Sequence, residues 1–360
     1  MKQFVLGFAL LLAVGVAPAF AQGKFSGYMF GDYSYNVTRP GNITSLSNVA
    51  SPAGTTAYQE FKLRRIYFAY DDEISETFSS RLRLEADQSS NTSDGKIGFA
   101  IKDAFLRWKN IFNGSDLYFG IQPTPTFDVS EGAWGYRSIE KTIMDLRGIA
   151  PSRDLGVALR GKVTGDGMVN YWVLIANGPG NKPETDKYKR YYGHLQFKPT
   201  AEMQFTVYAD FADRADVADP YSAGKKVSNG TLTAAVFGNY AVKNSFNVGL
   251  EAYTQSTSHG YDNGTSLASK SGLGLSVFGS VTVMPDVALV GRYDHFDPNT
   301  DSNAKYDARE YVVAGLSWKV DKNVAVQPNV LYETYQAPAA GRGAPDPSVT
   351  ARVTLFYTFL

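Results

Sequence analysis

Short segments in which apolar and polar residues alternate one by one recur along most of the chain. In residues 81–87 (RLRLEAD) every charged side chain falls on one parity and every aliphatic side chain on the other. Residues 204–211 and 246–251 repeat the alternation. Because successive side chains of a β-strand point to opposite faces, this pattern predicts strands with one apolar and one polar face.

The alternation predicts about sixteen strands, an even number, each long enough to cross a bilayer when tilted. We place them at residues 23–37, 58–70, 78–88, 96–109, 116–122, 153–163, 168–177, 189–198, 203–212, 231–242, 245–257, 270–283, 287–297, 305–320, 323–335 and 349–360. The stretch 62–66 (KLRRI) breaks the alternation, because consecutive arginines put one of them on the apolar face unless a bulge or a strand end intervenes. The sequence leaves that choice open.

The connections between these strands alternate in length. Short breaks lie at residues 71–77, 110–115, 164–167, 199–202, 243–244, 284–286 and 321–322. Long polar breaks lie at residues 38–57, 89–95, 123–152, 178–187, 213–229, 258–269, 298–304 and 336–348. Up-and-down outer-membrane barrels have short periplasmic turns and long external loops. The chain is therefore predicted to be all-β, a transmembrane antiparallel up-and-down β-barrel.

The N-terminal segment and the composition limit the ways in which this chain could be placed in a membrane. The N-terminus has Lys2, an apolar run over residues 4–16 and the tripeptide Ala19-Phe20-Ala21, which together predict a secretory signal at residues 1–21. Residues 22–360 then form a single barrel domain. No later run of roughly 18 apolar residues exists for a membrane-spanning helix, which leaves the closed barrel. The absence of cysteine excludes disulfides, a lipoprotein anchor and thiol-ligated metals.

Charge is balanced, with 35 basic and 35 acidic residues, so the chain has no net field that would draw nucleic acid. A basic side chain facing lipid costs roughly 2–4 kcal/mol, so strand charges should face the lumen. The basic candidates are Lys62, Arg64, Arg81, Arg83, Arg107, Arg160, Lys162, Arg292 and Arg352. The acidic candidates are Glu85, Asp87, Asp103, Glu251, Asp294 and Glu333. Opposed charges predict a transverse field and weak selectivity.

The longest connection, residues 123–152, is the third long loop. A barrel of this size encloses water, so selectivity requires something that narrows it. The loop is rich in Trp, Ile, Met and Leu, which need a wall to pack on, and we expect it to fold into the lumen with a short helix at residues 138–146. Its predicted constriction residues are Arg137, Glu140, Lys141, Asp145 and Arg147. The alternative is an external loop packed on its neighbours.

Several segments carry a resemblance to a known family. They are SEGAWGYRSIEKTIMD (130–145), SRDLGVALRGKV (152–163), FKLRRIYFAYDDEISETFSSRLRLEAD (61–87), GRYDHFDPN (291–299) and AVQPNVLYE (325–333). These segments resemble the phosphate-selective porin O and P family within the wider porins. The resemblance implies a sixteen-stranded, trimeric, passive channel whose third loop folds inward. It does not carry over the phosphate preference, which in that family rests on lumen arginines with a lysine cluster.

The C-terminal residues 356–359 (FYTF) resemble the aromatic signal that the barrel-assembly machinery reads, although the family pattern ends in Phe and this chain ends in Leu360. We therefore expect a bacterial outer-membrane porin, surrounded by lipid and lipopolysaccharide, that passes small hydrophilic solutes and ions. The alternatives are an anion- or phosphate-selective porin and a plugged structural or adhesive barrel.

Two sets of residues suggest other chemistry. His194, His259 and His295 are scattered and no Gly-x-Ser-x-Gly elbow lies near them, so no enzymatic activity is expected. A group of oxygen ligands near residue 300 lacks the glycine and terminal glutamate of an EF-hand and is predicted to be a hydrated turn. That group is Asp294, Asp297, Asn299, Asp301 and Asn303. No metal or cofactor is predicted.

Overall fold

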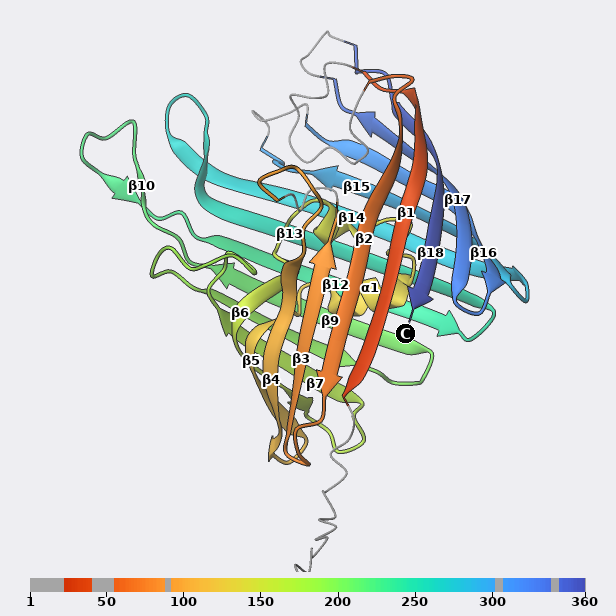
Figure 1. The fold of residues 1–360 in the computed structure, drawn as a ribbon. Coiled ribbons are helices and arrows are strands. Elements are labelled where there is room, and N and C mark those ends of the chain that lie inside the picture. The colour runs from red at the N-terminus through yellow and green to blue at the C-terminus, as the bar shows by residue number, and fades with distance from the viewer. Residues whose placement is uncertain (1–22, 41–54, 88–91, 302–306, 338–342, 360) are drawn as a thin grey trace, which may run out of the picture.

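The computed structural model describes residues 23–40, 55–87, 92–301, 307–337 and 343–359 (Figure 1). The barrel strands are β1 (Lys24–Thr38), β2 (Gln59–Asp72), β3 (Phe78–Ala86), β4 (Ala100–Phe112), β5 (Ser115–Pro123), β6 (Arg153–Lys162), β7 (Val169–Ala176), β8 (Arg190–Phe197), β9 (Met203–Ala212), β12 (Thr231–Val242), β13 (Phe246–Asp262), β14 (Leu267–Met284), β15 (Val287–Asp297), β16 (Arg309–Asp321), β17 (Val324–Tyr335) and β18 (Ser348–Phe359).

Over those residues the sixteen strands form one closed antiparallel barrel, in which each strand pairs with the next along the chain and β1 pairs with β18. Closure satisfies the backbone hydrogen bonds of every strand and leaves no open edge. The predicted fold class is confirmed. The predicted signal at residues 1–21 lies outside the described residues.

Several predicted loop boundaries are wrong. Strands β13 and β14 extend to Asp262 and Leu267, so most of the predicted loop 258–269 is strand. The predicted loop 213–229 contains a separate two-stranded hairpin, β10 (Val217–Ala218) with β11 (Lys226–Val227), which projects from the barrel in Figure 1. Antiparallel pairing continues where both faces are polar, because the backbone hydrogen bonds do not depend on hydrophobicity. The alternation that predicts strands disappears in such extensions.

The arginine pair in the KLRRI stretch is accommodated by a bulge. The register of β1 and β2 shifts between Phe30 and Gly31, where Arg64 is the extra residue on β2. Both Arg64 and its neighbour Arg65 then point into the lumen and form ion pairs, Arg64 with Asp32 at 3.1 Å and Arg65 with a carboxylate of β3. Of the two options that the sequence left open, the structure shows the bulge.

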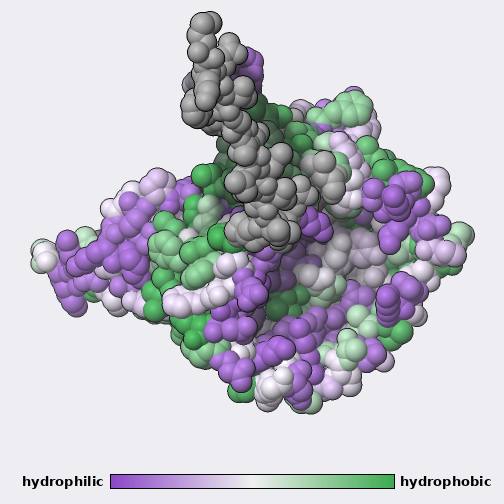
Figure 2. All heavy atoms as spheres, turned by 60° about the horizontal axis from the view of Figure 1, so that its bottom comes forward, coloured by the Kyte–Doolittle hydropathy of each residue, from purple (hydrophilic) through white to green (hydrophobic). Residues whose placement is uncertain are grey.

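The two faces of the barrel differ as the alternation predicts. Large apolar side chains such as Phe119, Val207 and Leu250 are exposed on the outer wall. In Figure 2 hydrophobic residues cover much of that wall, and hydrophilic residues gather around the barrel end that faces the viewer. Among the described residues, no helix is long and apolar enough to cross a membrane.

Candidate functional site in the barrel lumen

The third long loop, residues 124–152, folds inside the barrel, as predicted. It contains two short helices, α1 (Asp128–Trp134) and α2 (Ile143–Leu146). Trp134, Ile139, Ile143 and Met144 are at most 1% exposed. This degree of burial requires contact with the barrel wall, and it excludes the alternative of an external loop.

The predicted helix at residues 138–146 is wrong over its first half, where residues 137–139 form a turn, and α1 was not predicted. The segment of α1 contains Gly132, which disfavours a helix by about 1 kcal/mol relative to alanine. Packing compensates, since Ser130 and Trp134, four residues apart, lie on one side and are both buried. Gly135 ends the helix with a positive φ of 70°.

The wall that receives the loop is apolar in two patches. Trp134 packs edge-on against Phe278 with ring centroids 5.4 Å apart. The first patch lies on strands β12 to β17 and consists of Phe237, Phe278, Val290, Tyr311, Val313 and Leu331. The second receives Phe127, Ile143 and Met144, and includes Tyr118, Trp172, Leu174, Tyr192, Tyr208 and Tyr253. Loop 3 therefore packs on two apolar patches of the inner wall.

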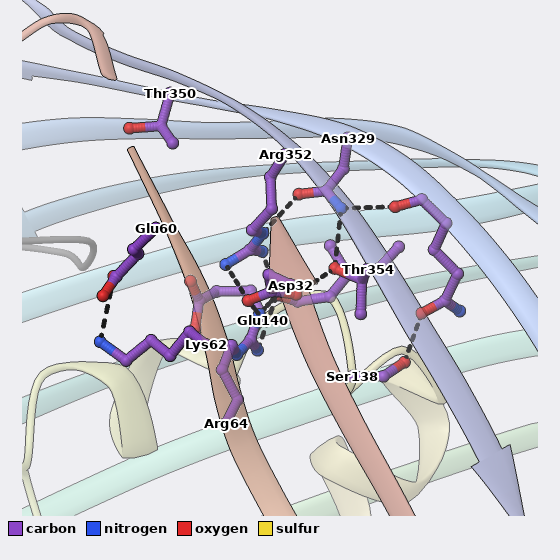
Figure 3. A network of polar contacts seen from close by, with 12 residues as sticks. Asp32, Glu60, Lys62, Arg64, Ser138, Glu140, Asn329, Thr350, Arg352 and Thr354 are labelled. Carbon is purple, nitrogen blue, oxygen red and sulfur yellow. Dashed lines mark hydrogen bonds and ion pairs between the residues drawn. The ribbon is translucent and has the colours of Figure 1, made fainter. Parts of the chain in front are cut away.

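Three arginines from the wall hold the middle of the loop through its backbone, and Figure 3 shows two of them, Arg64 and Arg352. Arg64 donates to the carbonyl oxygen of Ile139 through both terminal nitrogens at 3.0 Å. Arg352 donates to the same oxygen, and Arg292 donates to the carbonyl oxygen of Lys141. We call these three residues the arginine clamp. All three were predicted to line the lumen, and the structure shows that their guanidinium groups contact loop 3.

Glu140 lies among these guanidinium groups. It is 5% exposed and accepts a hydrogen bond from the hydroxyl of Tyr311 at 3.1 Å. Burial disfavours its ionised form, but the charges of Arg64 and Arg352 outweigh that effect and lower the pKa of Glu140 to about 2. Glu140 therefore belongs to the anchor of the loop, contrary to its predicted place on the pore side.

Arg147 is a second predicted constriction residue that the structure places against the wall. It pairs with Glu333 at 2.9 Å, and its guanidinium lies 4.9 Å from the ring centroid of Phe296. Its side chain has no exposed surface. An arginine buried in this way fixes the end of the loop, because removing one member of a buried ion pair is strongly destabilising.

The other three predicted constriction residues come together on the loop. Arg137 forms ion pairs with Glu131 at 3.1 Å and with Asp145 at 3.2 Å. Lys141 lies 3.7 Å from Asp145. Their side chains keep between 13% and 33% of their surface, whereas that of Arg147 keeps none. Of the predicted constriction residues, these three are the ones that remain partly exposed.

A basic cluster lies on the wall of strands β2, β3, β4 and β6. Arg83 and Arg153 share one carboxylate, that of Asp103, at 3.4 and 2.5 Å. Lys102 pairs with Glu85 at 2.8 Å, as Arg65 does. The full set is Arg65, Arg83, Lys102 and Arg153 with Glu85, Asp87 and Asp103. With four basic and three acidic members, this cluster has one net positive charge.

The sequence pattern missed Arg65, Lys102 and Arg153 as lumen residues. A register shift between β3 and β4 at Arg83 makes Lys102 the extra residue and turns it inward. Arg65 follows the other bulge, and Arg153 is the first residue of β6. Strict alternation assigns the wrong face at bulges and strand ends. A doubled charge such as Arg64-Arg65 or Lys102-Asp103 is the signal that indicates a bulge.

The remaining predicted lumen residues are spread along the pore. Arg81 pairs with Asp71 and Arg107 with Asp116, both at 2.6 Å, and Lys62 pairs with Glu60 at 3.4 Å. Glu251 is buried behind α1 and accepts a hydrogen bond from Ser130 at 2.8 Å. The guanidinium of Arg160 lies 3.5 Å from the ring centroid of Trp172 and 4.1 Å from that of Tyr118.

Two cavities lie on the short-turn side of loop 3. One of about 1000 Å³ is lined by Arg160, Lys162 and the turn residues Glu202 and Lys243, among others. The other, of about 630 Å³, is lined by residues that include Glu131 and Arg137. Asp128, Gly132, Ala133 and Asn247 line both cavities. Helix α1 therefore borders both cavities.

The suspected metal and enzyme residues are placed differently. Asp294 points into the lumen and pairs with Arg292 at 2.6 Å, so it is not part of an external loop, and Asn303 lies outside the described residues. In the described part of the chain, no three His, Cys, Asp or Glu side chains are grouped as a metal site. The Nδ1 atoms of His194 and His259 face backbone carbonyls, and that of His295 faces Glu310 at 2.8 Å.

Comparison with solved structures shows the fold of outer-membrane porins. The anion-selective porin from Comamonas acidovorans is 9% identical, with a TM-score of 0.65 over 94% of this chain and 99% of that one. The outer membrane channel DcaP of Acinetobacter baumannii is 12% identical, with a TM-score of 0.67 over 95% and 99%. The trimer form of OmpT from Vibrio cholerae is 12% identical, with a TM-score of 0.59 over 94% and 99%. No protein-family model and no curated protein matches the chain.

Proposed function

We propose that this protein is a bacterial outer-membrane porin, through which small hydrophilic solutes and ions diffuse down their gradients without bond-breaking chemistry. The observation that carries the proposal is the anchored loop 3, which narrows a closed barrel but leaves two cavities, both lined by residues of α1. A plugged structural barrel would have no need for charged, partly exposed side chains around such a gap. The porin fold of the neighbours supports the same function.

The membrane setting follows from the outer surface. Exposed apolar side chains on the outer wall suit contact with lipid and lipopolysaccharide, and the short turns would face the periplasm. We propose a homotrimer, since a neighbour of the same fold is described as a trimer. Insertion by the barrel-assembly machinery through β18 belongs to the same proposal.

Weak charge selectivity is the function that the lumen supports best. The basic wall cluster has one net positive charge, and the loop residues Asp128, Glu131, Arg137, Lys141 and Asp145 together have one net negative charge. Opposed and nearly balanced charges favour neither cations nor anions strongly. The pore should therefore discriminate mainly by size.

An anion- or phosphate-selective channel of the porin O and P type is the second candidate. Its support is the larger cavity, which is lined by four basic side chains, Arg160, Lys162, Lys198 and Lys243. Among the described residues none of these four forms an ion pair within 4.0 Å. One neighbour of the same fold is described as anion-selective.

Planar-bilayer recording of the purified protein tests both candidates. The porin proposal predicts stepwise conductance, and bilayers that stay silent with folded protein would contradict it. Reversal potentials in a potassium chloride gradient then separate the candidates. A potential near zero supports weak selectivity, whereas strong anion selectivity with block of chloride current by phosphate supports the second candidate.

A further inference from the structure

Four amide side chains form a row across the lumen wall on the short-turn side of loop 3. They are Gln196 on β8, Gln204 on β9, Asn239 on β12 and Asn247 on β13. Gln204 lies directly opposite Asn239 in the strand register, and all four residues line the cavity of about 1000 Å³. We call these four residues the amide row. It lies on strands other than β2 to β6, which hold the basic wall cluster.

Hydrogen bonds join the amide row into one chain. Gln196 donates to the side-chain oxygen of Gln204 at 3.0 Å, and Gln204 donates to that of Asn239 at 3.3 Å. Asn239 donates to the side-chain oxygen of Asn247, and Asn247 donates to the backbone carbonyl of Ala133 in α1 at 2.6 Å. The row therefore starts on the barrel wall and ends on loop 3, and each side chain is held by its neighbour.

The amide row keeps hydrogen-bonding capacity toward the cavity. A primary amide has two N–H donors and an oxygen that can accept two hydrogen bonds. In the contacts of the described residues, the row uses one N–H of Gln196, one of Gln204 and one of Asn247. A second N–H on each of them can bind a molecule in the cavity. Because these side chains are already ordered, they lose little further freedom when a solute binds.

The surroundings of the amide row favour an uncharged solute. The row itself has no charge, so an ion that left water to contact it would find no opposite charge there. The lysines of this cavity, Lys162, Lys198 and Lys243, are exposed at its turn end. The cavity is also lined by apolar residues of α1, Val129 and Ala133. Amides beside apolar groups suit a molecule that has many hydroxyls and also apolar C–H groups.

We propose that the amide row is a binding site for neutral polyhydroxyl solutes, the class of small sugars. Its free N–H and carbonyl groups would hydrogen-bond several hydroxyls of one sugar, while Val129 and Ala133 contact the C–H groups. A cavity of about 1000 Å³ is large enough for a disaccharide. The inference rests on the proposed channel function and names one class of solute that the channel binds.

Single-channel recording with maltose tests the site. Maltose is neutral, so its binding is seen as brief interruptions of the ion current without an electrostatic contribution. A polyethylene glycol of similar mass has few hydroxyl donors and is the control for size. We expect interruptions with maltose and far fewer with the polymer. Maltose should also bind more often from one side of the bilayer than from the other, because from the long-loop side it must first pass loop 3.

A substitution in the amide row tests which groups bind. Gln204→Met keeps the length of the side chain and removes its hydrogen bonds, so the binding constant for maltose should fall about fivefold, the effect of losing one hydrogen bond. The matched control is Asn170→Leu. Asn170 is an amide that lines the same cavity, but it donates to the carbonyl oxygen of Gly167 at 2.7 Å and is not part of the row. This variant should keep the wild-type constant.

The outcomes separate the site from the channel. A wild-type channel that conducts, but that maltose interrupts no more than the polymer does, would overturn the sugar site and leave the channel function intact. Equal binding rates from both sides, an unchanged constant in the Gln204 variant, or an equal fall in the Asn170 variant would overturn the assignment to the amide row. If folded wild-type protein does not conduct at all, the channel function itself fails.

Discussion

Substituting Glu140 by glutamine removes one negative charge from the buried centre that holds loop 3. That centre consists of the arginine clamp and three carboxylates, namely Arg64, Arg292 and Arg352 with Asp32, Asp294 and Glu140. Its charges balance in the wild type. Glutamine keeps the size of the side chain and a carbonyl oxygen for Tyr311, but the centre is left with one net positive charge.

The magnitude follows from the pKa. The pKa of Glu140 falls from 4.5 to about 2, which corresponds to roughly 3 kcal/mol in favour of the folded loop. Because the pKa in the folded state is the lower one, this contribution is complete above about pH 4.5 and is lost as the pH falls towards 2. The variant should therefore differ most from the wild type at neutral pH.

Single-channel recording shows the consequence most directly. Barrel strands pair independently of the loop, so the variant should insert, but its loop should leave the wall more often and give noisier, more frequently interrupted conductance at pH 7. The matched control is Glu60→Gln, which removes a carboxylate that pairs with Lys62 at 3.4 Å, away from the clamp. If the Glu140 variant has wild-type noise and conductance at pH 7, the electrostatic account of the anchor is refuted.

Three further predictions test separate parts of the structure. Arg137→Glu should raise the permeability of cations relative to anions, and an unchanged ratio would show that this side chain does not line the constriction. Burial raises the pKa of Glu131 although Arg137 opposes it, so on acidification Glu131 should become neutral at a higher pH than an ordinary glutamate. The reversal potential should then shift towards anion selectivity, a step that Glu131→Gln should abolish. Gly120→Ala should lower the yield of folded barrel, because the φ angle of Gly120 is +130° and the new Cβ would lie 2.2 Å from a backbone oxygen. The control Gly193→Ala should not lower the yield, because the atom nearest to its new Cβ lies 4.0 Å away.

The barrel fold could be predicted because the same physical constraint acts on every strand. Lipid outside and water inside impose the same two-residue period along the whole barrel, and turn length alternates with it. Segments such as 81–87 and 204–211 show that period without ambiguity. The strand predictions fail where no lipid-facing side imposes this period. Examples are β13 beyond residue 257 and the β10–β11 hairpin, whose sequences do not alternate.

The site could be predicted only in outline. Length and apolar content indicated that residues 123–152 needed a wall, and balanced charges indicated weak selectivity. Whether a given charge faces water or the back of the loop depends on packing across the barrel. Arg137 and Arg147 show the difficulty, since both are arginines of one loop and one is partly exposed while the other is buried on Phe296.

The inner wall shows why the sequence pattern does not tell which inward residues face water and which are covered by the loop. An alternating strand indicates which residues point inward, but inward positions include both Tyr311 and Val313, which bind the loop, and Arg83, which faces water. On β16 those inward apolar residues have outward apolar neighbours, so the period is hidden. A strand that is apolar on both faces marks the wall that a loop covers, because bare apolar surface in a water-filled lumen would be unfavourable. Applied to β16, this rule places loop 3 against the inward face of that strand, where Tyr311 and Val313 pack with Trp134 and Ile139.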